Sequence, residues 1–300
     1  MASILKQEEI IIDTLEINRK KAGLRRNLTQ VKHTISFELR RNLRKLEFLL
    51  VFHIVIFILS FLIVKSLESF GLTLPEDSAE YMQEHIGSFL AVSMGFSVSA
   101  LGGPIIAEDF DKQTGNLLFP KISKGRLLIG RLIARFFYMA ICLLSFYILI
   151  GIVTFIEYQN LPLTYFYSYT WGLFFSFAIL SFYTLISSFM KTTSMTIVFG
   201  ILFFAIVFQM IPMILSMAGL LNNNELPMYF ILNYYGAMVV YSLKMPVSRF
   251  EINKIPGTDN EYTSWETPSE IGAAIGLLLY IVITLLLAYV IYYRRQSKGE

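Results

Sequence analysis

The sequence predicts an all-α integral membrane protein with six transmembrane helices. Its 300 residues are 55% hydrophobic and 15% aromatic, and the mean hydropathy of +0.58 places the chain in the membrane class. A helix needs about 20 mainly apolar residues to cross the hydrocarbon, and in lipid it satisfies its own backbone hydrogen bonds. Apolar runs of at least that length cover residues 48–67, 86–106, 127–156, 169–190, 194–217 and 271–293.

These runs and their charged flanks divide the chain into three regions. A cytoplasmic leader with an amphipathic helix occupies residues 1–47, the six-span domain occupies 48–293, and a cytoplasmic tail occupies 294–300. Of the 25 Lys and Arg residues, 21 lie in the leader, in the tail, at Lys191, or between the second run and the start of the third. Because positively charged loops stay on the cytoplasmic side, we expect a multi-pass protein of the cell membrane with both termini in the cytoplasm. The net charge of +3 then reflects topology and does not indicate nucleic acid.

The end of the leader predicts a helix that lies in the membrane surface. Its apolar residues recur at helical spacing and therefore share one face. They are Leu28, Val31, Ile35, Leu39, Leu43 and Leu46. Basic residues on the other faces would lie near anionic lipid headgroups. The alternative is an ordinary solvated basic flank of the first span.

The second run carries small residues at every fourth position. These residues are Gly87, Ala91, Gly95, Ser99 and Gly103. Such a stripe lets another helix approach closely, because helix association in lipid depends on close van der Waals contact. We expect the stripe to pack against a helix of this chain or of a second copy. The alternative is that the serines of this run line a polar translocation path.

A long outer segment, residues 218–270, separates the fifth and sixth runs. The fourth and fifth runs are joined only by a short turn around Lys191, so we expect them to form an antiparallel hairpin. Within the outer segment, residues 226–243 carry no charge and could form a seventh span. Pro227, Asn233 and Gly236 weaken such a helix, so a re-entrant or interfacial piece is the prediction.

The chain shows no sequence motif for catalysis of its own. It has no P-loop, no H-E-x-x-H and no G-x-S-x-G motif. Its three histidines, His33, His53 and His85, are far apart in the sequence, so we predict no metal site. The span interiors lack the charged residues that ion-coupled transporters use. If the protein moves a cargo against a gradient, the energy therefore comes from a partner.

The stretch from Ala107 to Arg131, AEDFDKQTGNLLFPKISKGRLLIGR, is polar and rich in turn residues between two apolar runs. It reads Ala-Glu-Asp, then Thr-Gly, two leucines, Pro, Ile-Ser-Lys-Gly-Arg, and Leu-Leu-Ile-Gly-Arg at the start of the next span. Over these 25 residues it resembles the cytoplasmic signature of ABC-2 type transporter permeases, the membrane subunits of ABC exporters. The six-span layout with both termini inside resembles the same family.

The resemblance implies that this stretch contains a coupling helix, which docks on a separate cytoplasmic ABC ATPase. The implied interface is Glu108, Asp109, Asp111, Gln113, Thr114, Gly115, Leu117, Leu118 and Phe119. The implied partners are a dimer of ATPase subunits, a second permease copy or a sister permease, and membrane lipid. ATP and Mg would bind to the ATPase, and this chain would bind no cofactor.

Residue chemistry is consistent with a docking helix in this stretch. Asp109 and Asp111 would favour a helix start through the helix dipole, Pro120 would end it, and Ser123 would cap the next helix. An exposed Leu-Leu-Phe sequence in a cytoplasmic loop needs a cover. The arginines of the next span's first turns are expected only to fix the topology. These are Arg126, Arg131 and Arg135.

Three functional hypotheses follow. The first is a permease subunit of an ATP-driven exporter, with the coupling helices switching access to a path between two copies. The second is a membrane scaffold or sensor that does not transport and binds a partner through its outer loop. The third, a membrane-embedded hydrolase, has no nucleophile and base that the sequence can pair.

Overall fold

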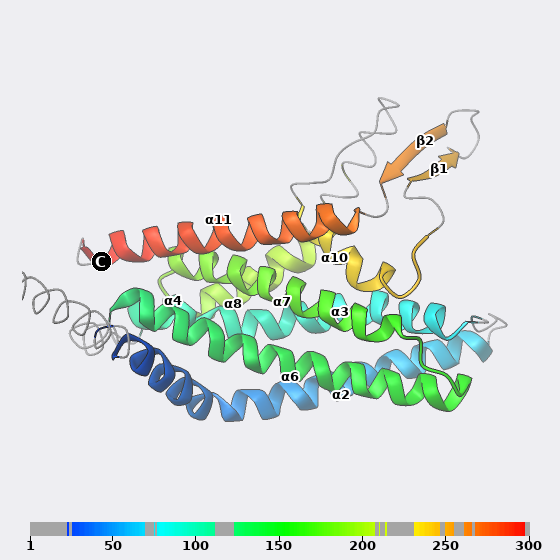
Figure 1. The fold of residues 1–300 in the computed structure, drawn as a ribbon, viewed down its shortest axis with the longest axis horizontal. Coiled ribbons are helices and arrows are strands. Elements are labelled where there is room, and N and C mark those ends of the chain that lie inside the picture. Colours follow the sequence, from blue (N-terminus) through cyan, green and yellow to red (C-terminus); the bar gives the residue numbers. More distant parts are fainter. Residues whose placement is uncertain are drawn as a thin grey trace, which may run out of the picture.

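A computed structural model describes residues 23, 26–69, 75, 77–111, 123–207, 210, 214, 231–246, 250–254, 261–265 and 268–297. Residues 26–41 form an N-terminal helix. The further helices are α2 (Leu43–Ser69), α3 (Ser78–Gly102), α4 (Pro104–Asp111), α6 (Lys124–Tyr158), α7 (Thr164–Phe189), α8 (Thr193–Leu202), the π-helix η1 (Phe203–Val207), α10 (Leu232–Tyr241) and α11 (Glu270–Ser297). The long helices lie along the longest axis of the molecule (Figure 1), and α7 packs against α3, α6, α10 and α11.

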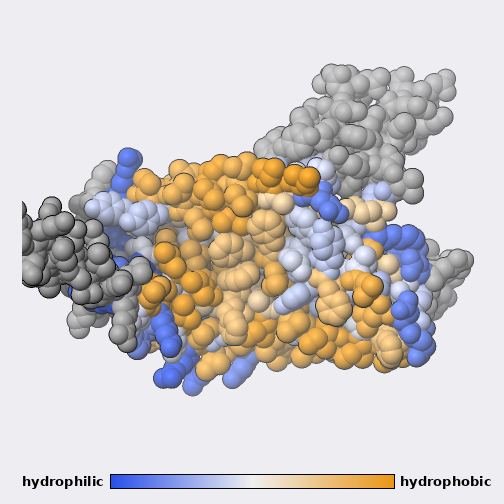
Figure 2. Space-filling model, viewed as in Figure 1, coloured by the Kyte–Doolittle hydropathy of each residue, from blue (hydrophilic) through white to orange (hydrophobic). Residues whose placement is uncertain are grey.

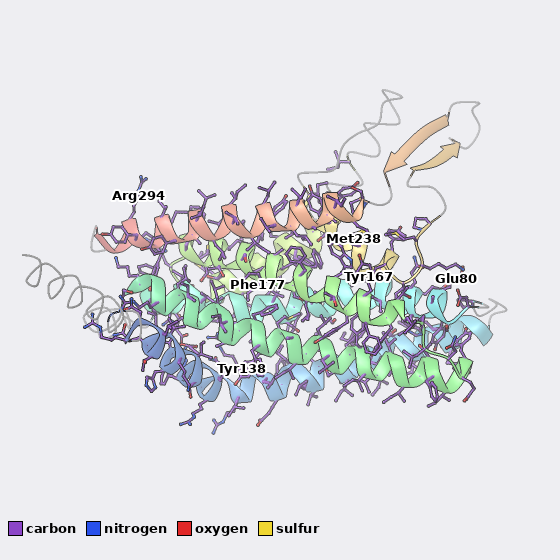
Figure 3. The ribbon with its side chains drawn as sticks, viewed as in Figure 1. Glu80, Tyr138, Tyr167, Phe177, Met238 and Arg294 are labelled. Carbon is purple, nitrogen blue, oxygen red and sulfur yellow. The ribbon has the colours of Figure 1, made fainter. Side chains whose placement is uncertain are left out.

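Four of the described helices, α2, α6, α7 and α11, are long and apolar enough to cross a membrane. They coincide with the first, third, fourth and sixth predicted runs. A hydrophobic belt covers the middle of the visible face, and hydrophilic residues gather at its two ends (Figure 2). Figure 3 shows Glu80 and Arg294 at these opposite ends. The belt and the four helices are typical of a multi-pass membrane protein.

Helix α3 begins eight residues before the predicted second run. Asp77 is its N-cap, and the Asp77 side chain accepts a hydrogen bond from the amide of Ala79 at 3.2 Å. Although the first turns contain polar residues, Tyr81 and His85 are 1% and 2% exposed. Packing against neighbouring helices therefore stabilises two turns that hydropathy alone does not mark.

Helix α4 follows α3 directly, with only Gly103 between them. The Ser187 hydroxyl of α7 accepts hydrogen bonds from the amides of Ile106 and Ala107 at 3.0 and 2.8 Å, and donates one to the Gly103 carbonyl at 2.6 Å. Pro104 occupies the first helical position, where its missing N–H costs nothing. One serine thus satisfies the backbone at the start of α4 and ties this start to α7.

The predicted helix start at Asp109 and Asp111 needs a correction, whereas residues 112–119 of the predicted coupling helix lie outside the described residues. We expected its start near Asp109 and Asp111, but α4 starts at Pro104 and these carboxylates lie in its last turn. Pro104 explains the difference, because it lacks the N–H that would continue α3 and starts a new helix five residues before Asp109. Ser123 is the N-cap residue of α6, as predicted, although its side chain makes no capping hydrogen bond.

The segment between α8 and α11 combines a short helix with two strands. Helix α10 has ten residues, about 15 Å of rise, which is half of the hydrocarbon thickness. Strands β1 (Phe250–Lys254) and β2 (Glu261–Trp265) form an antiparallel pair in which Phe250 faces Trp265. The sequence did not predict this pair, since residues 218–270 were expected only as a long outer segment with a re-entrant or interfacial piece at 226–243.

The two ends of the bundle can be followed along the chain. At one end Asp111 contacts Thr193, the first residue of α8. At the other end the Thr164 hydroxyl, at the start of α7, donates to the Leu243 carbonyl at 3.0 Å. The chain therefore passes from one end to the other between Thr193 and Leu243. The N-terminal helix and the C-terminal end of α11 lie at the same end (Figure 1).

Candidate functional site: a buried charge cluster beside α4

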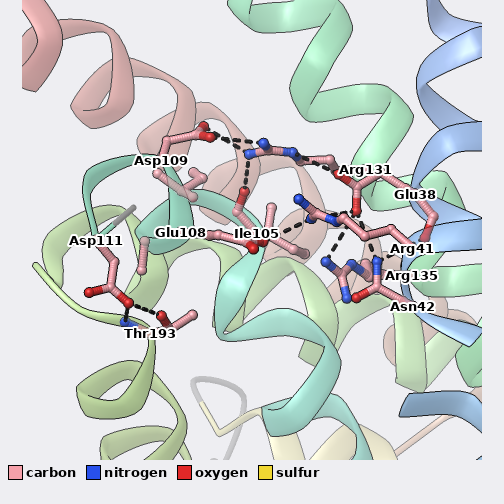
Figure 4. Close-up of polar contacts among 12 residues, drawn as sticks. Glu38, Arg41, Asn42, Ile105, Glu108, Asp109, Asp111, Arg131, Arg135 and Thr193 are labelled. Carbon is pink, nitrogen blue, oxygen red and sulfur yellow. Dashed lines mark hydrogen bonds and ion pairs between the residues drawn. The ribbon is translucent and has the colours of Figure 1, made fainter. Parts of the chain in front are cut away.

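Six charged side chains meet where the N-terminal helix, α4 and α6 converge (Figure 4). This buried charge cluster consists of Glu38, Arg41, Glu108, Asp109, Arg131 and Arg135. Three carboxylates face three guanidiniums, so their formal charges balance. All except Arg41 are at most 6% exposed. Charges so far removed from water are costly unless each has partners, so the geometry of the pairs decides whether the cluster is stable.

The pair between Asp109 and Arg131 joins α4 to α6. Nη1 and Nη2 of Arg131 donate to Oδ2 and Oδ1 of Asp109, both at 2.8 Å. Nη1 also donates to the Ile105 carbonyl at 2.7 Å, and the Tyr292 hydroxyl of α11 donates to Oδ2 of Asp109 at 2.6 Å. Two parallel charge-assisted bonds fix both distance and orientation. The last turn of α4 is therefore fixed to α6 and to α11.

Glu38 joins the N-terminal helix to α6. Its carboxylate lies 3.3 Å from Nε of Arg131 and 3.2 Å from Nη2 of Arg135. It also accepts hydrogen bonds from Arg41 at 2.9 Å and from the side-chain amide of Asn42 at 3.1 Å. One carboxylate thus faces three guanidiniums, and its ion pairs depend on the relative position of the N-terminal helix and α6.

Arg41 connects the N-terminal helix directly to α4. Its Nη2 donates to Glu38 at 2.9 Å and to Glu108 at 2.8 Å. Both buried carboxylates of α4 are therefore engaged, Asp109 with α6 and Glu108 with the N-terminal helix. A displacement of the last turn of α4 would act on both partners at once.

Arg135 is the least satisfied member of the cluster. Its side chain is fully buried and donates from Nη2 to Glu38, while Nε and Nη1 have no hydrogen-bond partner among the described residues. A buried guanidinium with free donors can accept another carboxylate if a neighbouring helix shifts. The cluster therefore has capacity to rearrange its pairs.

The same end of α4 also contacts α7, α8 and α11. Asp111 accepts hydrogen bonds from the hydroxyl and the amide of Thr193, at the start of α8. Arg295 of α11 lies over the ring of Phe110, with 3.9 Å between guanidinium carbon and ring centroid. It also donates to the carbonyls of Ser188 and Met190 at 2.8 and 2.9 Å. These bonds satisfy carbonyls at the C-terminal end of α7.

The structure separates the predicted interface residues. Glu108 and Asp109 point inward into the buried charge cluster, and Asp111 is exposed beside α8. The other predicted residues lie outside the described part of the chain. They are Gln113, Thr114, Gly115, Leu117, Leu118 and Phe119.

The expectation for the arginines of α6 is wrong for two of them. Arg131 and Arg135 are 2% and 0% exposed and hold ion pairs, so they do more than fix topology. They lie about two and three turns into α6, at positions that face the N-terminal helix and α4. The third, Arg126, is partly buried and donates to the side chain of Gln30 at 2.5 Å.

The reasoning from sequence missed Glu38 and Tyr292. Glu38 belongs to a row of polar residues, Thr34, Glu38 and Asn42, spaced four apart and 2–6% exposed. That spacing could have indicated a buried polar face. The apolar face identified in the sequence is partly open, since Leu28 and Leu43 are 63% and 49% exposed. The polar row thus packs on the bundle, beside Leu39 and Leu46, which contact the hydrophobic core.

The stripe of small residues in α3 faces other helices of the same chain. A Cβ on Gly95 would lie 2.4 Å from the Phe204 ring, and one on Gly103 would lie 2.8 Å from Ile197. Ser99 donates to the Tyr183 hydroxyl at 2.7 Å, and Gly87 faces Val240 at 3.6 Å. The fifth member, Ala91, has no described side-chain environment. The stripe thus packs against α7, α8, η1 and α10.

Two of the three histidines lie between α2 and α3. His53 and His85 are 1% and 2% exposed, and their Nδ1 atoms lie 2.8 Å from the Leu49 carbonyl and 2.7 Å from the Ser60 hydroxyl. Within the described part of the chain, no group of three or more His, Cys, Asp or Glu side chains could hold a metal ion.

No protein-family model matches the sequence, and no curated protein is significantly similar to it.

Proposed function

We propose that this chain is the permease subunit of an ATP-driven ABC exporter, coupled to a separate cytoplasmic ATPase through the segment between α4 and α6. The observation that carries the proposal is the set of contacts of α4. Its last turn leads directly into residues 112–122, and it holds ion pairs or hydrogen bonds to the N-terminal helix, α6, α8 and α11. A push on this segment would reach four other helices through short polar contacts.

The contacts of the buried charge cluster differ in how firmly they hold their helices. Bidentate pairs such as Asp109 with Arg131 resist both sliding and rotation. Arg135, with unpaired donors, can change its partner when α4 or the N-terminal helix moves. The buried charge cluster would therefore transmit a displacement and accommodate two arrangements of the same helices, as a switching element requires.

The membrane topology of the proposal has six spans with both termini in the cytoplasm. Four described helices are long and apolar enough to span, and α3 has 25 residues. The remaining crossing, the fifth along the chain, would be supplied by α8, η1 and the residues that follow. The contacts of Thr193 and Leu243 at opposite ends of the bundle support this crossing. Helix α10 would be a re-entrant piece. The Lys and Arg excess at the end with the two termini sets the orientation.

The proposed assembly needs a second permease copy or a sister permease, surrounding lipid, and an ATPase dimer that binds ATP and Mg. The sequence has no P-loop of its own, so nucleotide binding is assigned to the partner. Leu117, Leu118 and Phe119 would provide apolar anchors on the ATPase. A membrane scaffold or sensor remains the second candidate, supported by the β1–β2 pair at the other end of the bundle.

Copurification tests the proposal. The chain is purified gently from its native membranes, and the proteins that accompany it in stoichiometric amount are identified by mass spectrometry. The proposal predicts a P-loop ATPase among them. The double variant Leu117→Asp and Leu118→Asp should lose the ATPase and keep the helical content and thermal unfolding of the wild type.

The matched control is Lys191→Asp, in the exposed turn between α7 and α8 at the same end of the bundle. This variant introduces the same charge and should retain the ATPase. Recovery of the wild-type chain without any P-loop ATPase, under conditions that preserve other ATPase complexes, would support the scaffold or sensor and contradict the permease.

A further inference from the structure

Positive charge is concentrated on the N-terminal helix and the first turn of α2. This helix runs obliquely into α2 at one end of the bundle (Figure 1). Every residue from Arg26 to Phe48 is described, and the exposed charged residues among them are basic except for Glu47. The exposed basic residues are Arg26, Lys32, Arg40, Arg41, Arg44 and Lys45. This segment is therefore strongly cationic on its exposed side.

Arg40 and Arg44 have no counterion within the described part of the chain. Neither forms an ion pair there, whereas the neighbouring Arg41 pairs with Glu38 and Glu108 of the buried charge cluster. Arg40 lies two residues from both Glu38 and Asn42, about 200° around the helix from these buried side chains. Its guanidinium therefore points away from the bundle and is open to an external anion.

An exposed phenylalanine accompanies these two arginines. Phe37, Arg40 and Arg44 follow one another at spacings of three and four residues, so they share one helix face, which we call the outer basic face. Phe37 is 58% exposed on it. A face that combines cations with an apolar ring fits the boundary between headgroups and acyl chains, because the ring enters the apolar layer while the guanidiniums stay at the phosphates.

The outer basic face lies at the edge of the hydrophobic belt. Along α2, the exposed apolar residues Phe48, Val51 and Val55 begin that belt, at 60%, 60% and 47% exposure. Arg44 stands four residues before Phe48, about 6 Å of helix rise. The headgroup layer of a bilayer is about 5–7 Å thick on each side of the hydrocarbon. Arg44 is thus at the depth of lipid phosphates when the belt fills the hydrocarbon.

We infer that the outer basic face binds anionic phospholipids, with Arg40 and Arg44 at their phosphates and Phe37 at the start of their acyl chains. The sequence pattern had placed the apolar row of this helix on lipid, but Leu39 and Leu46 of that row pack on the hydrophobic core. Opposite charge favours the anionic lipid over a zwitterionic one. This binding needs no ATPase, so it can be tested independently of the permease proposal.

A fluorophore at position 36 reports on this face. Ser36 is exposed and lies one turn before Arg40. The one cysteine of the chain, Cys142, is buried, so in Ser36→Cys a thiol-reactive fluorophore attaches at position 36. The full chain is placed in nanodiscs of phosphatidylcholine and phosphatidylglycerol. A nitroxide quencher near the start of an acyl chain is carried either by the phosphatidylglycerol or by an equal amount of the phosphatidylcholine.

We expect quenching by phosphatidylglycerol to be at least about threefold stronger, because each basic residue near an anionic surface favours an anionic lipid about fivefold. The double variant Arg40→Gln and Arg44→Gln should bring the ratio close to one. Salt at about 1 M should do the same, since the screening length is then about 3 Å. The matched control is Lys191→Gln with Arg294→Gln, which removes two exposed cations at the same end of the bundle and should keep the ratio (Figure 3).

Three results would overturn the inference. Equal quenching by the two lipids would show that the face does not select charge. A ratio that survives the double variant or high salt, or that is lost equally in the control, would show that these two arginines do not select the lipid. No quenching by either lipid would place the face in water or against protein.

Discussion

Asp109 of α4 and Arg131 of α6 face each other through two parallel hydrogen bonds of 2.8 Å, although both side chains are at most 4% exposed. Bonds of this kind are among the strongest polar contacts in proteins, and they are specific in direction. Asp109 stands three residues before residues 112–122, where the sequence predicts contact with a partner. In the proposed permease, the pair would pass movement from that segment to the bundle.

The first prediction concerns the free energy of unfolding. Asp109→Asn keeps the size of the side chain but removes the bidentate partner of Arg131, which keeps only the Glu38 carboxylate, 3.3 Å from its Nε. Breaking a buried pair by removing one partner costs about 3–5 kcal/mol, because the other charge stays buried. Denaturant-induced unfolding in micelles, followed by circular dichroism, should show a loss of that order.

The control for this variant is Asp77→Asn. Asp77 is the exposed N-cap of α3, and its carboxylate lies 3.5 Å from the exposed Lys244. Exposed pairs contribute little, and Asn caps helices as well as Asp does. No measurable change is expected. Equal effects of the two substitutions would show that burial of the Asp109 pair has no energetic consequence.

The second prediction isolates the bond from α11. Tyr292→Phe removes the hydroxyl that donates to Asp109 at 2.6 Å and leaves the ring in place. A hydrogen bond to a charged group contributes about 1.5–3 kcal/mol, so the free energy of unfolding should fall by that amount. Tyr293→Phe, at a ring that is 56% exposed, should leave it unchanged. If Tyr292→Phe left the free energy of unfolding unchanged, the bond from α11 would not stabilise the buried charge cluster.

The third prediction concerns the attachment of the N-terminal helix. Glu38→Gln removes the carboxylate shared by Arg41, Arg131 and Arg135. Amide hydrogen exchange over residues 26–41 should accelerate at least tenfold, while exchange in α7 stays as in the wild type. Unchanged protection of the N-terminal helix would mean that its apolar contacts, and not its ion pairs, hold it on the bundle.

The fourth prediction concerns the contact between α3 and η1. Gly95→Ala places a Cβ 2.4 Å from the Phe204 ring, and such overpacking costs about 1–3 kcal/mol. Phe204→Leu should relieve part of this cost, so a double-mutant cycle should give a favourable coupling energy. Gly125→Ala is the matched control, because its nearest contact would be an ordinary 3.6 Å to Tyr289.

Long apolar runs allowed four helices to be predicted from the sequence. The predicted runs 48–67, 127–156 and 271–293 lie within α2, α6 and α11, respectively. The run 169–190 begins five residues after the start of α7 and ends one residue after its end. The early start of α3 could not be predicted, because tertiary packing, not hydropathy, protects its first turns. The β1–β2 pair was missed because the alternation in β1 covers only Phe250 to Asn253, and β2, with the sequence EYTSW, does not alternate.

The buried charge cluster illustrates what a single sequence leaves open. Arg131, Arg135 and their carboxylate partners can each be recognised as charged in the sequence. The partners, however, are 22 to 97 residues apart along the chain. Hydropathy and periodicity describe one helix at a time and do not say which charges meet. The row Thr34, Glu38 and Asn42 was the only local signal of a buried polar face.

The most direct test of coupling to an ATPase is site-specific photocrosslinking in native membranes. A photoreactive phenylalanine analogue replaces Leu117, and in a control chain it replaces Lys244, which is exposed at the opposite end of the bundle. Coupling through this segment predicts a crosslinked product at position 117 that contains a P-loop ATPase, and none from position 244. Products at position 117 that contain only lipid or other membrane proteins would contradict it.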